Sequence, residues 1–191
     1  MKKYLIYTYL FSVLWISTIG AKTAALVVAY RDFQPRECLV TKQLIEKAGI
    51  TTLMVSDKPG VAQSDGFKVT IKKTVSELTP DDYNGIFFIG GPGALNYLDN
   101  NTSYQALKTA AANDKIYGAI CISPRILAKA GVLTGKDATG WDGDNKLTSV
   151  FKTYGVTYVH KNVVIDGNVI TATDPMAAEG FARGIIKLLK E

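Results

Sequence analysis

Short apolar runs without a charged residue recur along this chain and restrict it to folds with a sheet that is buried on both faces. Residues 24–29, 86–89 and 116–120 are such runs. Continuous apolar character over a strand's length is typical of parallel sheets, which are covered on both sides. A more polar run, residues 67–71, is expected to be a further strand. Residues 35–47 have the character of a helix opened by a proline, and a polar helix is expected from about Tyr104 to Asn113. The alternation of strand-like and helix-like segments along the chain predicts an α/β fold, with a mostly parallel sheet between helices.

The composition of the 191 residues narrows the possible functions. Hydrophobic residues make up 47% and charged residues 20%, as in a globular domain. The formal net charge is +5, but the basic residues are dispersed and not interleaved with aromatic ones, which argues against nucleic-acid binding. One histidine and two cysteines supply no recognisable set of metal ligands. We therefore expect no nucleic-acid partner, no metal and no cofactor.

The first residues, 1–21, have the layout of an export signal. Two lysines near the start precede residues 4–21, which carry no charge, and the small residues Gly20 and Ala21 end the run. The run is also long enough to remain as a membrane anchor. We expect the N-terminus to engage the membrane or the secretion machinery. Residues 22–191 would then form the folded domain outside the cytoplasm, either periplasmic or membrane-anchored.

Cys121 directly follows the apolar run 116–120, and Pro124 suits the first turn of a helix. A helix N-terminus favours the thiolate, so we expect a pKa below the usual value of about 8.5. Nucleophilic serines occupy the same kind of strand-to-helix turn in α/β hydrolases. The alternative is a buried structural cysteine. The glycine-rich loop 90–93 follows another predicted strand, and ligands bind at the carboxyl ends of such strands, which favours the nucleophile.

Glu37 lies in the first turn of the predicted helix 35–47, on the same face as Val40 and Leu44. Burial of a carboxylate is costly, so one interpretation is an acid with a raised pKa at a functional site, although the local sequence alone does not favour it. The alternative is an acid that complements the helix dipole. The single histidine, His160, lies in a strand-like segment and is expected at the surface or a sheet edge.

Taken together, these motifs resemble the ThiJ/PfpI superfamily, which includes the parkinsonism-associated deglycase and PfpI-type proteins. The resemblance extends over nearly all of the chain after the export signal, with motifs in the same order and spacing. It implies a flavodoxin-like three-layer sandwich of the class I glutamine-amidotransferase type, with a nucleophile elbow. The matching runs are residues 119–121 with Pro124, 128–133, Gly90 with Gly91, Glu37 ahead of 48–50, and 166–171 with Pro175.

The resemblance also implies a role for each of five residues. Cys121 matches the elbow cysteine, held in a strained backbone conformation, and Glu37 matches the acid that hydrogen-bonds to it. Gly90, Gly91 and Ile122 match the site that binds a developing oxyanion through backbone N–H groups. Many members are dimers, so a homodimer is expected.

Three positions depart from the family pattern. PfpI-type peptidases carry a histidine directly after the nucleophile, where this chain has Ile122, and Trp141 occupies a place where the deglycase branch often has a histidine. Without a Cys–His pair, a peptidase lacks its general base. The usual Gly-Pro before the last helix is Asp174-Pro175 here. The last helix is expected to begin at Pro175, with Asp174 as its N-cap. An export signal is also atypical of this mostly cytoplasmic family.

The leading hypothesis is a cofactor-free, cysteine-dependent enzyme, a hydro-lyase or hydrolase of the glyoxalase or deglycase kind, that acts on small reactive carbonyl compounds. That chemistry needs one nucleophile and one acid–base group. The main alternative is a non-enzymatic redox sensor or chaperone with an oxidisable Cys121. A peptidase and an inert binding scaffold are further alternatives. No Cys38–Cys121 disulfide is expected. Glu37 is expected to face Cys121, and one helical residue turns the side chain of Cys38 about 100° away from that of Glu37.

Overall fold

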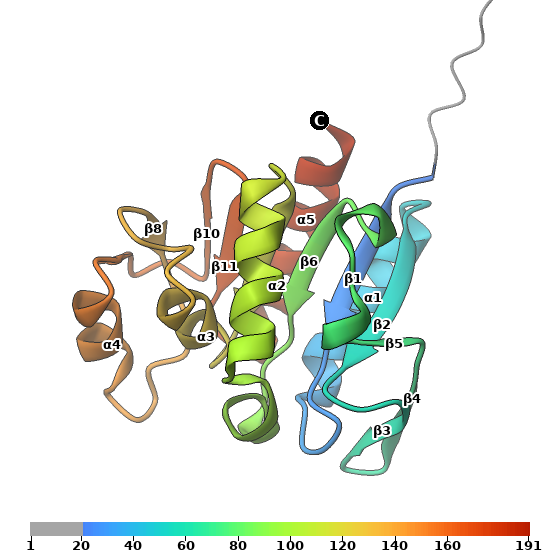
Figure 1. Ribbon diagram of the computed structural model, residues 1–191. Coiled ribbons are helices and arrows are strands. Elements are labelled where there is room, and N and C mark those ends of the chain that lie inside the picture. Colours follow the sequence, from blue (N-terminus) through green and yellow to red (C-terminus); the bar gives the residue numbers. More distant parts are fainter. Residues whose placement is uncertain (1–20) are drawn as a thin grey trace, which may run out of the picture.

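A seven-stranded, mainly parallel sheet forms the centre of the protein in the computed structural model, which describes residues 21–191 (Figure 1). Nearly all of the predicted export segment therefore lies outside the described residues. The strand order is β10-β11-β7-β6-β1-β2-β5, and only the β10–β11 pair is antiparallel. The strands are β1 (Thr23–Val27), β2 (Thr51–Ser56), β5 (Lys73–Thr74), β6 (Gly85–Phe88), β7 (Ile116–Ile120), β10 (Val163–Asp166) and β11 (Val169–Ala172).

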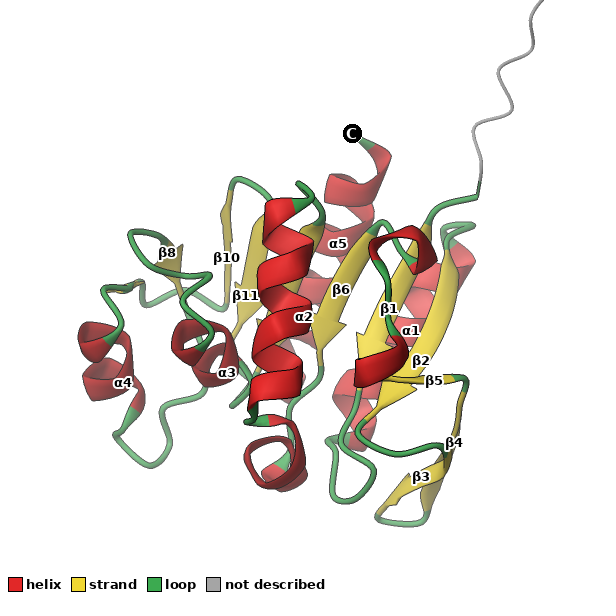
Figure 2. Cartoon of the chain, in the orientation of Figure 1, coloured by secondary structure: helices red, strands yellow, loops and turns green. Residues whose placement is uncertain are grey.

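Helices cover both faces of the sheet and give the predicted three-layer α/β sandwich (Figure 2). Helices α1 (Pro35–Lys47) and α5 (Ala178–Lys190) pack against each other on one face. Helices α2 (Asn101–Ala112) and α3 (Pro124–Lys129) lie on the other face, and α4 (Leu147–Thr153) packs against α3.

Alternate residues of the central strands enter two separate cores. In β1, Val27 belongs to the core beneath α2 and α3, whereas Leu26 belongs to the core beneath α1 and α5. In β6, Phe88 and Phe87 divide in the same way, and all four side chains are fully buried. Each such side chain contributes about 1.5–3 kcal/mol through burial. Burial on both faces therefore explains why these strands are continuously apolar.

The predicted strand at residues 67–71 forms, but it lies outside the main sheet. It is β4 (Phe67–Ile71), which pairs with β3 (Gly60–Ser64) in a separate antiparallel hairpin. The two-residue turn Asp65–Gly66 has positive φ at both positions, as a type I′ turn requires. The sheet edge beside β2 is taken by the two residues of β5 instead. Half-exposed β4 is thus a surface element, and its strand-like pattern alone does not specify its partner.

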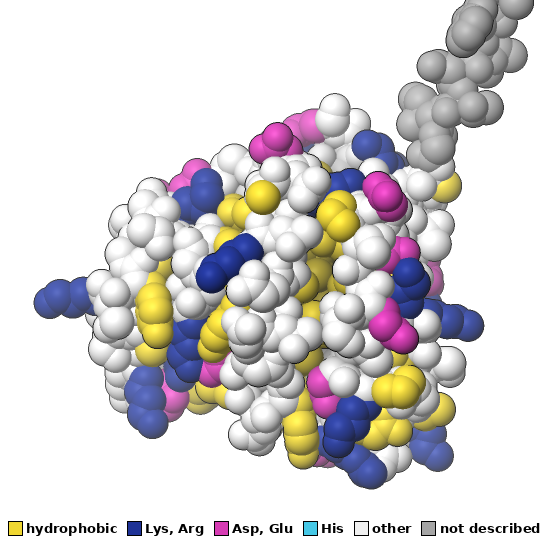
Figure 3. Space-filling model, viewed as in Figure 1, with side chains coloured by type: hydrophobic (Ala, Val, Ile, Leu, Met, Phe, Trp, Pro, Cys, Tyr) yellow, Lys and Arg dark blue, Asp and Glu magenta, His cyan; other side chains and the backbone are white. Residues whose placement is uncertain are grey.

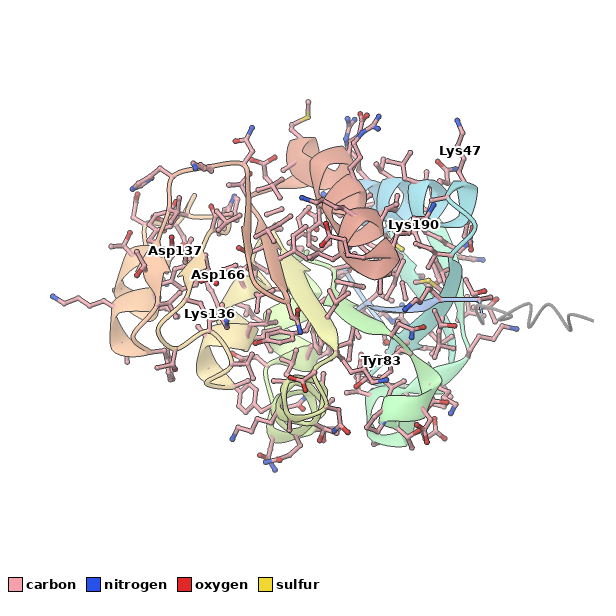
Figure 4. The ribbon with its side chains drawn as sticks, turned by 90° about the horizontal axis from the view of Figure 1, so that it is seen from above. Lys47, Tyr83, Lys136, Asp137, Asp166 and Lys190 are labelled. Carbon is pink, nitrogen blue, oxygen red and sulfur yellow. The ribbon has the colours of Figure 1, made fainter. Side chains whose placement is uncertain are left out.

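A second small sheet extends one side of the molecule. Strands β8 (Asp137–Ala138) and β9 (Thr157–Tyr158) are parallel. Figure 4 shows Lys136, Asp137 and Asp166 gathered where β8 meets the β10–β11 hairpin. The Asp137 N–H donates to Asp166 Oδ2 over 2.9 Å, and Lys136 Nζ lies 3.9 Å from Asp166 Oδ1. These contacts fix the segment that leads from α3 into the loop around Trp141.

Short helices complete the described chain. The last helix begins, as predicted, at Pro175, although its first turn is a 3-10 helix. Asp174 is its N-cap, as expected: its Oδ1 accepts from the N–H groups of Met176 (2.7 Å) and Ala177 (3.3 Å). The 3-10 segments are η1 (Val75–Glu77), η2 (Pro80–Asp82) and η4 (Pro175–Ala177), and η3 (Ala94–Leu98) is a π-helix.

The surface is mixed in charge. On the face shown in Figure 3, lysine and arginine side chains are dispersed among acidic and neutral ones. His160 is exposed, as expected, and its ring lies 4.3 Å from that of Tyr158. None of the helices within residues 21–191 has both the length and the apolar character needed to cross a membrane.

Candidate active site

Cys121 sits in a strained turn at the carboxyl edge of the sheet. Strand β7 ends at Ile120, α3 begins at Pro124, and Cys121 between them has a φ of +65°. A positive φ is uncommon outside glycine and costs about 1–3 kcal/mol. Two hydrogen bonds hold this conformation: the Cys121 N–H donates to Ala172 O (3.0 Å), and the Trp141 N–H donates to Cys121 O (2.7 Å). The turn has the strained elbow geometry that the family resemblance implies.

The loop after β6 approaches the elbow so closely that only glycine fits. A Cβ atom on Gly90 would collide with Cys121 Cβ and would lie 3.0 Å from its Sγ and 2.8 Å from Glu37 Oε2. Gly91 has a φ of +110°, and a Cβ there would collide with the Gln34 backbone. The Gln34 N–H also donates to Gly90 O over 2.8 Å. The glycine loop thus joins the start of α1 to the elbow.

Glu37 points into the protein beside the thiol. Its side chain is fully buried, as predicted, and its Oε2 accepts from the Gly90 N–H over 2.9 Å. Its Oε1 is buried and has no assigned hydrogen-bond partner among the described residues. The Cys121 thiol interacts with the same carboxyl group. A buried, unpaired carboxylate oxygen is costly, whereas a protonated oxygen can donate a hydrogen bond. The geometry therefore favours a proton on or near Oε1.

Burial raises the pKa of Glu37 to about 7. The hydrogen bonds from Gly90 and Cys121 oppose this rise, and the charge of Asp174 adds to it. Burial likewise raises the pKa of Cys121 to about 12, with a further contribution from an ionised Glu37; the N–H groups of Gly91 and Ile122 oppose it.

The prediction of a low pKa for Cys121 is therefore wrong when Glu37 is ionised. The dipole argument considered the helix N-terminus and left out the cost of burying the thiolate. Here the thiol is largely buried and α3 has only six residues, so desolvation exceeds the helix effect.

The two groups act as one acid–base pair. Their pKa values of about 7 and about 12 mean that, between these values, the pair holds one proton and one negative charge. Transfer of that proton from Sγ to the Glu37 carboxylate creates a thiolate and a neutral acid. The Gly91 and Ile122 N–H groups point at the sulfur and stabilise its charge. The site can thus supply a nucleophile and an acid from one shared proton.

The thiol opens onto a cavity of about 470 Å³ at this edge of the sheet. Gly91 and Ile122, both predicted to belong to the site, line it together with Cys121, while Gly90 and Glu37 lie behind the sulfur. The complete lining is Gln34, Gly91, Pro92, Cys121, Ile122, Trp141, Asp144, Asp174 and Pro175. Sequence reasoning noted Trp141 and Asp174 as departures from a family pattern, and Asp174 also as a helix cap, but it did not place either in the cavity. It did not identify Gln34 or Asp144 as part of the site.

A second cavity, of about 480 Å³, lies between α1 and the β3–β4 hairpin and contains Cys38. Burial raises the pKa of Cys38 to about 12. Cys38 has regular helical backbone and packs in the core beneath α1 and α5. Only Cys121 has the strained turn and the neighbouring buried acid, so its cavity is the candidate active site. Both cysteines are free in the structure, and the absence of a disulfide in the native protein stays a prediction.

Arg125, which nothing in the sequence pattern singles out, holds one wall of the Cys121 cavity. Its side chain is buried and binds Asp144 in a bidentate pair, with N–O distances of 3.0 and 2.5 Å. The hydrogen bond to Arg125 lowers the pKa of Asp144 to about 2. Arg125 also donates to Trp141 O (3.1 Å) and lies 5.7 Å from the centre of the Trp141 ring. Because the Trp141 N–H holds Cys121 O, this clamp reaches the elbow itself.

Among residues 21–191, no group of three or more His, Cys, Asp and Glu side chains is arranged to hold a metal ion. The groups that the described site offers for chemistry are the Cys121 thiol, the Glu37 carboxyl and the backbone N–H groups of Gly91 and Ile122. A strained cysteine elbow beside a buried glutamate, on a three-layer α/β sandwich, is the arrangement that the resemblance to the ThiJ/PfpI superfamily implies.

Comparison with known proteins agrees: residues 22–188 match the DJ-1/PfpI family, and the chain belongs to it. An uncharacterised protein of Methanocaldococcus jannaschii is 36% identical over 168 residues, 87% of this chain and 82% of that protein. The deglycase PfpI of Pyrococcus furiosus is 26% identical over 86% of this chain and 98% of its own length. The crystal structure of a ThiJ/PfpI domain protein from Brachyspira murdochii covers 90% of this chain and 98% of that one, with 28% identity and a TM-score of 0.83.

Proposed function

We propose that this protein is a cysteine-dependent enzyme that acts on small reactive carbonyl compounds such as methylglyoxal or its adducts. The observation that carries the proposal is the buried Cys121–Glu37 pair, which shares one proton at the edge of an open cavity. Similarity to proteins named as deglycases, including that of Pyrococcus furiosus, supports the same class of chemistry. The site needs neither a histidine nor a cofactor for it.

The proposed reaction has three steps: addition of the thiolate, proton transfer by Glu37, and hydrolysis. The Cys121 thiolate adds to the aldehyde carbon, and the new oxyanion takes up a proton after stabilisation by the Gly91 and Ile122 N–H groups. Glu37 removes the proton from that carbon and returns one to the neighbouring carbon, which converts the hemithioacetal into a thioester of a hydroxy acid. Water then hydrolyses the thioester and releases the thiol. The sum is 2-oxoaldehyde plus water to 2-hydroxy acid: the aldehyde carbon is oxidised and the neighbouring ketone carbon is reduced, so no external oxidant is needed.

A redox role for Cys121 is the second candidate. The sulfur lines the cavity, so a small oxidant can reach it, and the same N–H groups and Glu37 would stabilise a sulfinate. A peptidase is disfavoured because His160, the single histidine, is exposed and does not line the cavity, and because Ile122 follows the nucleophile.

The test is methylglyoxal consumption by the wild type and by Cys121→Ser, with Cys38→Ala as the matched thiol control. We expect Cys38→Ala to retain turnover and Cys121→Ser to lose it. Absence of turnover in the wild type, together with a mass gain on Cys121 after mild peroxide, would place the redox role first.

We also propose that residues 1–21 direct export and that the folded domain is a homodimer. The charge-free run behind two lysines supports export. N-terminal sequencing of the native protein should show a start near Lys22, or the full chain should fractionate with membranes. Light scattering should give twice the monomer mass. Full-length protein in the soluble cytoplasm would refute export, and a monomer mass would refute the dimer.

A further inference from the structure

Asp174 occupies a place in the active-site cavity where the family resemblance implies a glycine. It lies between β11 and η4, lines the same cavity as Cys121, and is half-buried. Its Oδ1 is held by the N–H groups of Met176 and Ala177 at 2.7 and 3.3 Å. The carboxylate is therefore fixed in position at the cavity wall and is not a mobile surface group.

Among the described residues of the cavity lining, no positively charged side chain compensates the negative charge of Asp174. Asp144, the second acid of the lining, is neutralised by its bidentate pair with buried Arg125. Within residues 21–191, Asp174 takes part in no salt bridge, and no lysine, arginine or histidine lines the cavity. The exposed Arg36 approaches this loop, but its Nε donates to Pro175 O (3.2 Å).

The chemistry at the sulfur makes the excess negative charge larger. The Cys121–Glu37 pair carries one negative charge between its two pKa values, and the charge of Asp174 acts on Glu37. The remaining walls include Pro92, Ile122 and the Trp141 side chain, which offer apolar surface. A substrate that brings its own carboxylate into this cavity meets repulsion and no cation to pair with.

We propose that Asp174 is a specificity-determining residue that excludes carboxylate-bearing carbonyl compounds from Cys121 and admits uncharged ones. The statement about substrates rests on the proposed function. The underlying charge selection does not, because it applies to any small reagent that approaches the sulfur.

The direct test uses two alkylating reagents of nearly equal size, neutral iodoacetamide and anionic iodoacetate. In both reactions the Cys121 thiolate displaces iodide and forms a C–S bond. The ratio of the two rates therefore cancels any change in thiolate population. Mass spectrometry can follow Cys121 alone, since Cys38 and Cys121 fall in different tryptic peptides, residues 37–42 and 116–125.

The variants are Asp174→Asn, which keeps an oxygen for the helix cap, and Glu179→Gln as a matched control. Glu179 is an exposed acid at the start of α5, pairs with Arg183 and lies outside the cavity lining, so its removal changes the net charge equally. We expect the wild type to prefer iodoacetamide about tenfold more than a free uncharged thiol does, which corresponds to about 1.4 kcal/mol. Asp174→Asn should lose most of this preference, and Glu179→Gln should keep it.

An unchanged ratio in Asp174→Asn, or an equal change in Glu179→Gln, would overturn the proposal. Should Asp174→Asn fail to fold, the wild type alone decides: its preference over the free thiol must be present and must decrease in high salt. Turnover provides the link to substrates, as Asp174→Asn should raise kcat/KM for 4,5-dioxopentanoate, a 2-oxoaldehyde that carries a carboxylate, relative to methylglyoxal about tenfold. If neither carbonyl turns over while the alkylation ratios behave as expected, the proposed function fails and the charge selection stands.

Discussion

Replacement of Glu37 by glutamine tests whether the thiol and the acid share a proton. The ionised Glu37 is the second-largest cause of the raised pKa of Cys121, after burial, and its hydrogen bond with the thiol acts in the same direction. Both contributions disappear in Glu37→Gln, while burial remains. A unit charge at about 4 Å contributes about 4 kcal/mol at an effective dielectric constant near 20, equivalent to about three pKa units. We expect the pKa of Cys121 to fall from about 12 by about one to three units.

The assay is the ultraviolet absorbance of the thiolate as a function of pH. It is run in a Cys38→Ala background, because the pKa of Cys38 is also about 12 and would overlap. Methylglyoxal turnover is measured in parallel and should be lost, since an amide cannot carry the transferred proton. Glu46→Gln is the matched control: Glu46 lies on the same helix but is largely exposed and pairs with Lys42.

An unchanged or higher pKa of Cys121 in Glu37→Gln would refute the shared-proton interpretation. Full turnover in that variant would refute the role of Glu37 as the acid–base group, while a positioning role would survive. A fall in Glu46→Gln of the same size would show that the effect is one of net charge and not of the pair.

Three further outcomes follow from the same geometry. Because the pKa of Glu37 rises from 4.5 unfolded to about 7 folded, the folded state binds more protons between these values, so the free energy of unfolding should fall by about 3 kcal/mol as pH rises through that window. Denaturant titrations should show this slope for the wild type and not for Glu37→Gln. Gly90→Ala should abolish turnover and lower stability by more than about 2 kcal/mol, because the added Cβ collides with Cys121; wild-type melting and activity would contradict this. Arg125→Met should lower the free energy of unfolding by about 2 kcal/mol and reduce Cys121 alkylation, since it leaves Asp144 and a backbone carbonyl unpaired; loss of stability with unchanged alkylation would show that the clamp does not reach the elbow.

Helix bounds could be predicted from the sequence where the residues that start and end the helix lie within the same segment. Helix α1 has the predicted bounds, because a proline starts it and the chain turns at Gly49, where φ is +81°. Helix α2 begins at Asn101, earlier than the predicted start near Tyr104, because Asn100 caps it by accepting from the Ser103 N–H over 3.2 Å. A polar first turn carries no hydrophobic period, so the pattern located only the amphipathic part.

Each candidate site residue could be predicted from its own segment: Cys121 from the end of a strand and Glu37 from the start of a helix. Cys121 and Glu37 are separated by many residues, and their contact follows from the order of strands in the sheet, which no single segment encodes. The role of Arg125 depends on a bidentate partner in a loop without regular structure. The sequence also does not show how deeply the Cys121 sulfur is buried. For this reason the expected direction of its pKa shift was wrong.

The two hydrogen bonds that hold the elbow have a consequence for the order of assembly. The partners of Cys121 are Ala172, in the last parallel strand, and Trp141, in the loop beyond α3. Both follow Cys121 in the chain, so a growing polypeptide contains the cysteine long before it contains the groups that impose the positive φ. Until β11 docks, nothing holds the Cys121 backbone at positive φ. Until then, the thiol has the reactivity of an unstructured cysteine. Maturation of the reactive sulfur is thus coupled to completion of the chain.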